Sequence, residues 1–218
     1  MKMNHLLALL AIPLLLCSCR KEILRGSGPQ GTRQLTMPAF TAVETHYDIA
    51  AEISYGATQQ IEVTGYENLL NELKIAVEDG ILKLKFDTRY ERVTNGNVVV
   101  KIKVPALAKA TIHGSRDINI SGLNNGATLH ARIHGSGSIR IANSSYQKAI
   151  LDIHGSGLVV AQGLQVAEAE ANVFGSGHSS ISVSQRLKVT VNGSGNVYYW
   201  GNPQLETTYN GSGRAIKR

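Results

Sequence analysis

Three histidines recur at nearly regular spacing in the second half of the chain, each directly before a glycine: His113, His134 and His154. On neighbouring strands of a β-structure such side chains lie about 5 Å apart, close enough for two imidazoles to share a transition-metal ion. Columns of identical side chains are also an ordinary feature of stacked repeats, and no carboxylate occupies the same repeat position. The sequence therefore favours an outward-facing structural column. Metal binding is the alternative, and neither a metal nor a cofactor is expected.

The other reactive side chains do not form a catalytic set. A serine follows the first glycine of every repeat, but no histidine–carboxylate pair accompanies these serines at a fixed offset, as an activated nucleophile requires. In the aligned repeats Arg132 falls beside Asp152, and Glu170 beside Lys188 and Glu206, which predicts ion-pair ladders. We therefore expect no enzymatic activity. A polysaccharide-active enzyme that uses Asp152 or Glu170 is the less favoured alternative.

Aromatic residues gather near the C-terminus. Tyr199 and Trp200 could stack on sugar rings or on a partner protein, or they could fill the end of the core. Tyr209 occupies an inward position of its repeat, so we expect it to cap the core. The predicted binding surface combines the histidine column with the two open aromatic positions: His113, His134, His154, Tyr199 and Trp200.

These side chains are positioned by a repeat that begins near Ala108. Six motifs, Gly-Ser-Gly or once Gly-Ser-Arg, follow one another at intervals of 18 to 21 residues, and this glycine punctuation is typical of a β-solenoid. Positions two, four and six residues before the first glycine are almost all apolar and share one face of a strand. A second apolar strand follows each motif. The first glycines are Gly114, Gly135, Gly155, Gly175, Gly193 and Gly211.

The first half of the domain shows the same strand signals without the motif. Alternating apolar residues predict strands over 60–63, 81–86 and 98–104, and Glu78-Asp79-Gly80 predicts a turn. Residues 67–73 are expected to form one short helical turn. The chain is thus predicted to be all-β, with N-terminal strands over 35–107 and six coils over 108–218 in a single domain.

Several of these segments together resemble a known bacterial family, the auto-transporter adhesin, head GIN domain. They are Ile61-Glu62-Val63-Thr64-Gly65, Glu78-Asp79-Gly80-Ile81-Leu82, the step Val104-Pro105, the strand near Phe40 and the serial Gly-Ser-Gly motifs. The resemblance implies a right-handed parallel β-helix of the pectate-lyase type, covering 35–218, in an exported protein with an adhesive role. Arg116 departs from the pattern, because it replaces the second glycine of the first motif.

The N-terminus reads as an export signal. Lys2 precedes an apolar run from Leu6 to Leu16 that is too short to cross a bilayer as a helix. The segment Leu16-Cys17-Ser18-Cys19 resembles a bacterial lipoprotein signal, so we expect a signal peptide over 1–18, lipidation of Cys19 and a flexible tether over 19–34. An ordinary secretory signal is the alternative. Both cysteines lie here, so the domain has no pair for a disulfide.

The net charge of +6 does not indicate a nucleic-acid partner, because the basic residues are scattered and form no run that would follow a phosphate backbone. The expected protein is a non-enzymatic lipoprotein of the cell envelope, held on the outer membrane by its lipid. It would be an adhesin or surface-binding module with a glycan or protein ligand. The alternative is a structural envelope protein that associates with copies of itself.

Overall fold

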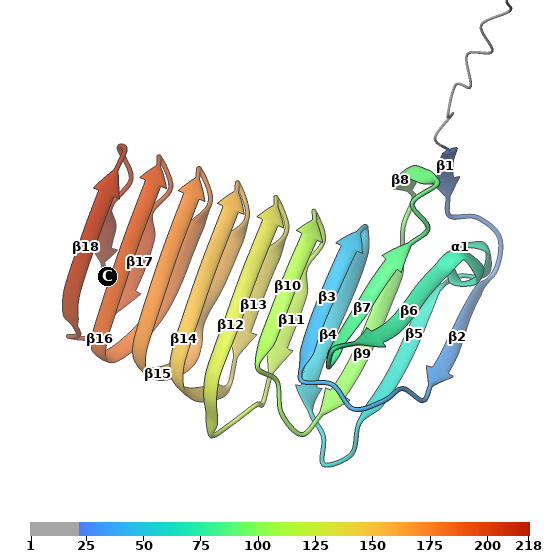
Figure 1. Ribbon diagram of the computed structural model, residues 1–218, viewed down its shortest axis with the longest axis horizontal. Coiled ribbons are helices and arrows are strands. Elements are labelled where there is room, and N and C mark those ends of the chain that lie inside the picture. Colours follow the sequence, from blue (N-terminus) through green and yellow to red (C-terminus); the bar gives the residue numbers. More distant parts are fainter. Residues whose placement is uncertain (1–21) are drawn as a thin grey trace, which may run out of the picture.

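The computed structural model describes residues 22–218 and shows one elongated all-β domain, a parallel β-solenoid, as the sequence predicts (Figure 1). Strands stack side by side along the long axis, from β2 and α1 at one end to β18 at the other. The expected signal peptide and Cys19 lie outside the described residues. Within the described part, no helix is long and apolar enough to cross a membrane.

Two parallel sheets form the faces of the solenoid. The first face is built from β3 (Ala42–Tyr47), β10 (Lys109–Gly114), β12 (Gly126–Gly135), β14 (Ser144–Gly155), the later parts of β15 (Leu158–Gly175) and β16 (His178–Gly193), and β18 (Gln204–Asn210). The second face is built from β4 (Ile49–Tyr55), β11 (Ile118–Ser121), β13 (Ser138–Ala142), the early parts of β15 and β16, β17 (Val197–Trp200) and β19 (Ala215–Lys217).

The core lies between the faces and contains the apolar columns that the repeat predicts. Ala131, Ile133 and Leu151 are fully buried, as are most of their counterparts on other rungs. Each isoleucine or leucine among them contributes about 1.5–3 kcal/mol on burial, and the rungs stacked on either side cover it. Within residues 22–218 the columns are exposed only at their ends: Ala108 is exposed ahead of β10, and Leu205 is 41% exposed on the terminal rung.

The first glycine of each motif makes the corner between the two faces. Gly155 has a φ of +127°, and a Cβ added to it would lie 2.5 Å from the carbonyl oxygen of Gly135 on the rung before. Positive φ and a close approach of the neighbouring backbone are both present at this corner, and each of them favours glycine. At the one irregular motif, Arg116 fills the corner with a side chain whose Nε lies 2.5 Å from Oδ1 of Asp48.

The N-terminal strands continue both faces. On the first face, β7 (Ile81–Phe86) pairs parallel with β3 and forms an antiparallel hairpin with β6 (Leu73–Glu78), with Asp79 and Gly80 at the turn. On the second, β9 (Val98–Val104) pairs parallel with β4 and antiparallel with β5 (Gln60–Tyr66). The helix α1 (Glu67–Glu72) contributes the buried Leu69 and Leu70 to this end, which confirms the predicted helical turn.

The prediction of a flexible tether over 19–34 is wrong for its described part. Strand β1 (Glu22–Arg25) pairs with β8 (Tyr90–Thr94), and β2 (Gln30–Leu35) pairs antiparallel with β5. The edge of β5 offers unpaired backbone groups that β2 satisfies, and Arg33 adds a hydrogen bond of 3.1 Å to the carbonyl of Leu70. Glycine and arginine content suggested a linker, but the alternation of Gln30–Leu35 fits an edge strand.

Candidate binding column and groove

The predicted histidines form a continuous stack of rings on the outside of the first face. Ring centroids lie 4.9 Å apart between His113 and His134 and again between His134 and His154, with interplanar angles of 9° and 19°. The stack extends in both directions, to His46 on β3 at 4.6 Å and to Phe174 on β15 at 4.7 Å. In-register parallel pairing of the strands produces this arrangement. We call His46, His113, His134 and His154 the imidazole column.

The electrostatics of the column favour the neutral imidazole at its two central histidines, His113 and His134. Partial burial lowers the pKa of His113, and the neighbouring charges of His46, His134 and Lys109 lower it further, against the opposing effect of Glu44. Burial and the charge of His154 likewise lower the pKa of His134. Two protonated rings on neighbouring rungs would repel each other. His113 and His134 therefore favour the neutral form, in which a ring nitrogen can accept a hydrogen bond or bind a metal.

Sequence comparison of the repeats missed a carboxylate beside the column. Glu44 lies on β3, and its Oε1 is 2.6 Å from Nε2 of His46 and 3.9 Å from Nε2 of His113. The rung of β3 has Tyr47, with a φ of +59°, where the later rungs have glycine, so a search for glycine motifs does not find it. The signal that could have found it is the alternation of Val43-Glu44-Thr45-His46, which matches residues 110–113.

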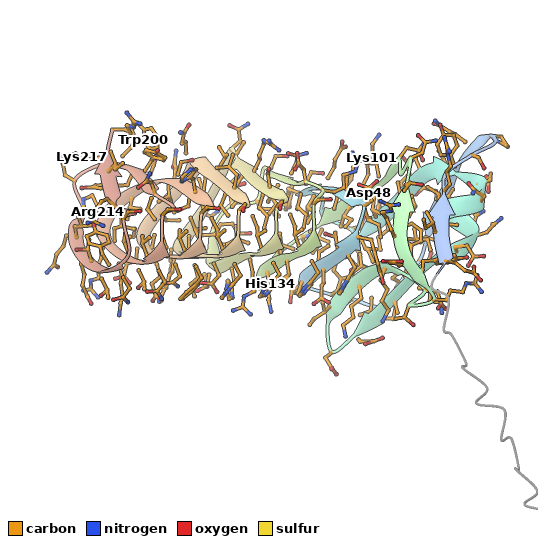
Figure 2. The ribbon with its side chains drawn as sticks, turned by 90° about the horizontal axis from the view of Figure 1, so that it is seen from above. Asp48, Lys101, His134, Trp200, Arg214 and Lys217 are labelled. Atoms are coloured by element: carbon orange, nitrogen blue, oxygen red, sulfur yellow. The ribbon has the colours of Figure 1, made fainter. Side chains whose placement is uncertain are left out.

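The two aromatic candidates separate in the structure. Tyr199 points into the core and is 9% exposed, so it does not belong to a binding surface. Trp200, the next residue, points outward from the end of β17 and is half-buried. Figure 2 places Trp200 and His134 on opposite sides of the body. The single surface predicted from the sequence is therefore two separate surfaces.

Trp200 lies at an open groove of about 750 Å³ along the edge opposite the glycine corners. The groove runs across successive rungs. Its floor is formed by the buried side chains of Tyr146, Val166 and Val183. Polar residues along it are Ser145, Gln165, Ser182, Ser184 and Asn202. We call this feature the Trp200 groove.

The family model described as "Putative auto-transporter adhesin, head GIN domain" matches residues 39–203, most of the described chain. The chain belongs to this head GIN domain family. The resemblance noted in the sequence is thus confirmed. No curated protein matches the chain.

Solved structures share the fold of this head GIN domain at low identity. A putative adhesin from Bacteroides fragilis has a TM-score of 0.73 and 19% identity over 89% of this chain and 100% of its own. A putative lipid binding protein from Parabacteroides distasonis has a TM-score of 0.54, 20% identity, and coverage of 90% and 100%. A putative adhesin from Parabacteroides merdae has a TM-score of 0.52, 22% identity, and coverage of 90% and 99%.

Asp152 and Glu170, the two acidic residues considered for an enzyme, both form ion pairs with residues of neighbouring rungs in this head GIN domain. Asp152 Oδ2 lies 2.6 Å from Nε2 of His130 and 3.0 Å from a terminal nitrogen of Arg132, and its Oδ1 accepts a hydrogen bond from Asn172 at 2.9 Å. Burial acts to raise the pKa of Asp152, but these three partners outweigh it and hold the pKa far below its usual range. The carboxylate is thus a fixed anion in a saturated network.

The remaining expected pairs show the same pattern. Lys188 lies 3.7 Å from Glu206, whereas Glu170 pairs with Lys148 at 2.5 Å rather than with Lys188. Ser156 and Ser176 share a hydrogen bond of 3.0 Å, and within residues 22–218 no serine of the six motifs bonds to a histidine or a carboxylate. These contacts stabilise the wall of the solenoid.

Proposed function

We propose that this head GIN domain is a non-enzymatic adhesin of the cell envelope whose Trp200 groove binds an extended glycan. The observation that carries the proposal is an indole beside a shallow groove that combines an apolar floor with hydroxyl and amide groups. Sugar rings present apolar faces that stack on aromatic rings, and hydroxyl groups that exchange hydrogen bonds with such side chains. An open groove along the rod suits a chain better than a compact ligand.

The polar groups of the groove support this assignment. Ser182 donates its hydroxyl hydrogen to the carbonyl of Gln162 at 3.1 Å, and Ser184 donates to the carbonyl of Val166 at 3.2 Å. Both hydroxyl oxygens are therefore held in place with lone pairs free to accept from a ligand. The related P. distasonis structure is described as lipid binding, which makes an acyl chain the competing ligand for the same floor.

The test is a glycan array with the purified protein, followed by titration of each hit. Trp200 is the single tryptophan of the chain, so its fluorescence reports on the groove directly. We expect Trp200→Ala to weaken binding roughly tenfold, which corresponds to about 1.4 kcal/mol. Because this variant contains no tryptophan, calorimetry measures binding by all variants. Tyr198→Ala is the matched control, because Tyr198 also points outward from β17 but does not line the groove. Equal losses in both variants, or binding of fatty acid but no glycan, would refute the proposal.

The envelope location rests on the sequence. The proposal is that Cys19 is lipidated and holds the rod on the outer membrane, with the described strands beginning at Glu22, a few residues after the anchor. Cys19→Ala should move the protein from the membrane fraction to the soluble fraction of the envelope. Protease treatment of whole cells then shows on which side of the outer membrane the rod lies.

A second candidate is a self-assembling envelope component. The observation in its favour is the open end of the solenoid, where Leu205 is 41% exposed and, among the described strands, β18 pairs only with β16. Arg214, Lys217 and Arg218 place positive charge on the same end and oppose end-to-end association. Sedimentation of the purified protein decides between the two: a monomer at high concentration contradicts self-assembly.

A further inference from the structure

The N-terminal end of the imidazole column brings three metal-ligand side chains together. Glu44 and His46 are two residues apart on β3 and point to the same side, and His113 is the direct partner of His46 on β10. One ligand atom of each lies within 4.8 Å of the other two. All three residues are partly exposed, with side-chain exposures of 20%, 29% and 37% for Glu44, His46 and His113. An ion in solution can therefore reach them.

The distances suit one small ion after a modest adjustment of side chains. Zinc binds nitrogen and carboxylate oxygen at about 2.1 Å, so two ligands of a tetrahedral ion lie about 3.4 Å apart. The distances from Oε1 of Glu44, 2.6 Å to His46 and 3.9 Å to His113, lie on either side of that value. The backbone need not move, because strand pairing already places the three side chains on one surface. The remaining coordination positions face solvent.

The chemistry of the three side chains also fits. Two imidazoles and one carboxylate form a donor set that zinc and copper ions bind well. Lys83 and Lys109 are the cations whose charges oppose the ion.

A similar constellation further along the column lacks a free carboxylate. Asp152 and His154 lie two residues apart on β14, as Glu44 and His46 do on β3, but their histidine neighbour His134 lies on the preceding rung, β12, rather than on the following one. There the oxygens of Asp152 are held by His130, Arg132 and Asn172, and the guanidinium adds a fixed positive charge. Among residues 22–218, by contrast, the side chains within hydrogen-bond or ion-pair distance of the Glu44 carboxylate are only those of His46 and His113. We therefore place the metal site at the N-terminal end of the imidazole column.

We propose that Glu44, His46 and His113 form a binding site for a divalent transition-metal ion of the zinc and copper class. The site lies on the first face, away from the Trp200 groove, and does not depend on what the groove binds. Because the ion would join β3 to β10, it would cross-link the N-terminal strands to the first Gly-Ser rung.

The test is calorimetric titration of the protein, produced without a histidine tag, with Zn²⁺ near neutral pH, and with Mg²⁺ as the hard-ion control. We expect one Zn²⁺ per chain and no heat with Mg²⁺. His46→Gln and His113→Gln should each weaken this binding at least tenfold, and Glu44→Gln should weaken it as well. The matched control is His154→Gln, a residue of the same column without a free carboxylate beside it. Cys17 and Cys19 are replaced by serine in every protein compared, so that thiolates do not contribute to the measured stoichiometry.

Three results would overturn the proposal: no Zn²⁺ binding, equal loss in His154→Gln and His113→Gln, or no effect of Glu44→Gln. The melting temperature of every variant without metal shows whether it folds. A second measurement follows the histidine NMR signals. Substoichiometric Zn²⁺ should shift those of His46 and His113 before that of His154, and a uniform shift of the whole column would contradict a defined site.

Discussion

The glycine corner offers a stability test that follows directly from the stacking. Replacing Gly155 by alanine puts a Cβ on a residue with a φ of +127°, and that atom would lie 2.5 Å from the carbonyl oxygen of Gly135. The oxygen cannot move away freely, because it accepts the backbone hydrogen bond of Ser156 at 3.1 Å. The substitution therefore combines an unfavourable backbone conformation with an overlap in the backbone stack.

The loss of stability expected for Gly155→Ala can be compared with that for a second glycine of positive φ, Gly80. A residue held in a sparsely populated backbone region costs about 1–3 kcal/mol, and overpacking costs about 1–3 kcal/mol more. Reduced entropy of the unfolded chain offsets about 0.4–1 kcal/mol of this. Gly155→Ala should thus lower the free energy of unfolding by about 2–5 kcal/mol. Gly80 has a φ of +73° but open space around it, so Gly80→Ala should cost about 1 kcal/mol or less.

Urea unfolding of both variants and the wild type gives the two differences. Circular dichroism follows the strands of the whole chain, and the fluorescence of Trp200 follows the C-terminal rungs. A Gly155→Ala variant that loses no more stability than Gly80→Ala would refute the argument that the corner requires glycine. Different midpoints from the two signals would show that the rungs on either side of the corner unfold separately.

Two further predictions concern protonation. Asp152→Asn should lower the free energy of unfolding by about 1–3 kcal/mol at neutral pH. Because folding lowers the pKa of Asp152, the stability difference between wild type and variant should shrink as the pH falls below about 3.9, the pKa of an unfolded aspartate. Urea midpoints measured across pH test this, and a difference that does not change with pH would contradict it. His113 and His134 should titrate below about 6.5 when followed by NMR, because folding lowers both pKa values. The free energy of unfolding of the wild type should therefore fall as the pH drops through that value, and it should fall less in His113→Gln. Titration of either histidine at or above 6.5 would count against this.

The sequence alone predicted which side chains point inward and outward in the repeated part of the molecule. Periodicity identified the inward positions, and Ile112, Ile133 and Ile153 are buried as one column. It also placed the histidines outside on neighbouring rungs. These features depend only on register, and the glycine motifs fix the register from rung to rung. The motif is missing on the rung of β3, where Tyr47 replaces the glycine. The alignment of repeats therefore began one rung too late, and the carboxylate of Glu44 was missed.

Position around the coil could not be predicted. Parity assigns a side chain to the inside or the outside of a strand, and comparison with Val197 would have placed Tyr199 inside. It does not say on which wall an outward residue lies. Trp200 and His134 are both outward, yet they belong to different faces of the solenoid.

The pairing of β2 with β5 was missed for another reason. An antiparallel edge strand lies outside the repeat, so no spacing in the sequence indicates which strand it pairs with.

The two proposed sites share a physical property, which is that each lies where a column of side chains is interrupted. In an in-register solenoid a repeated side chain has the same neighbours on every rung, so it forms a wall rather than a defined site. Glu44 is followed by Thr111 on the next rung, so an acid meets the imidazole column at this end, and no arginine among residues 22–218 forms an ion pair with it. Trp200 is paired with the small Ser182, and the two residues line the groove together. The local break in the repeat, rather than the repeat itself, creates the surface on which a ligand can be recognised.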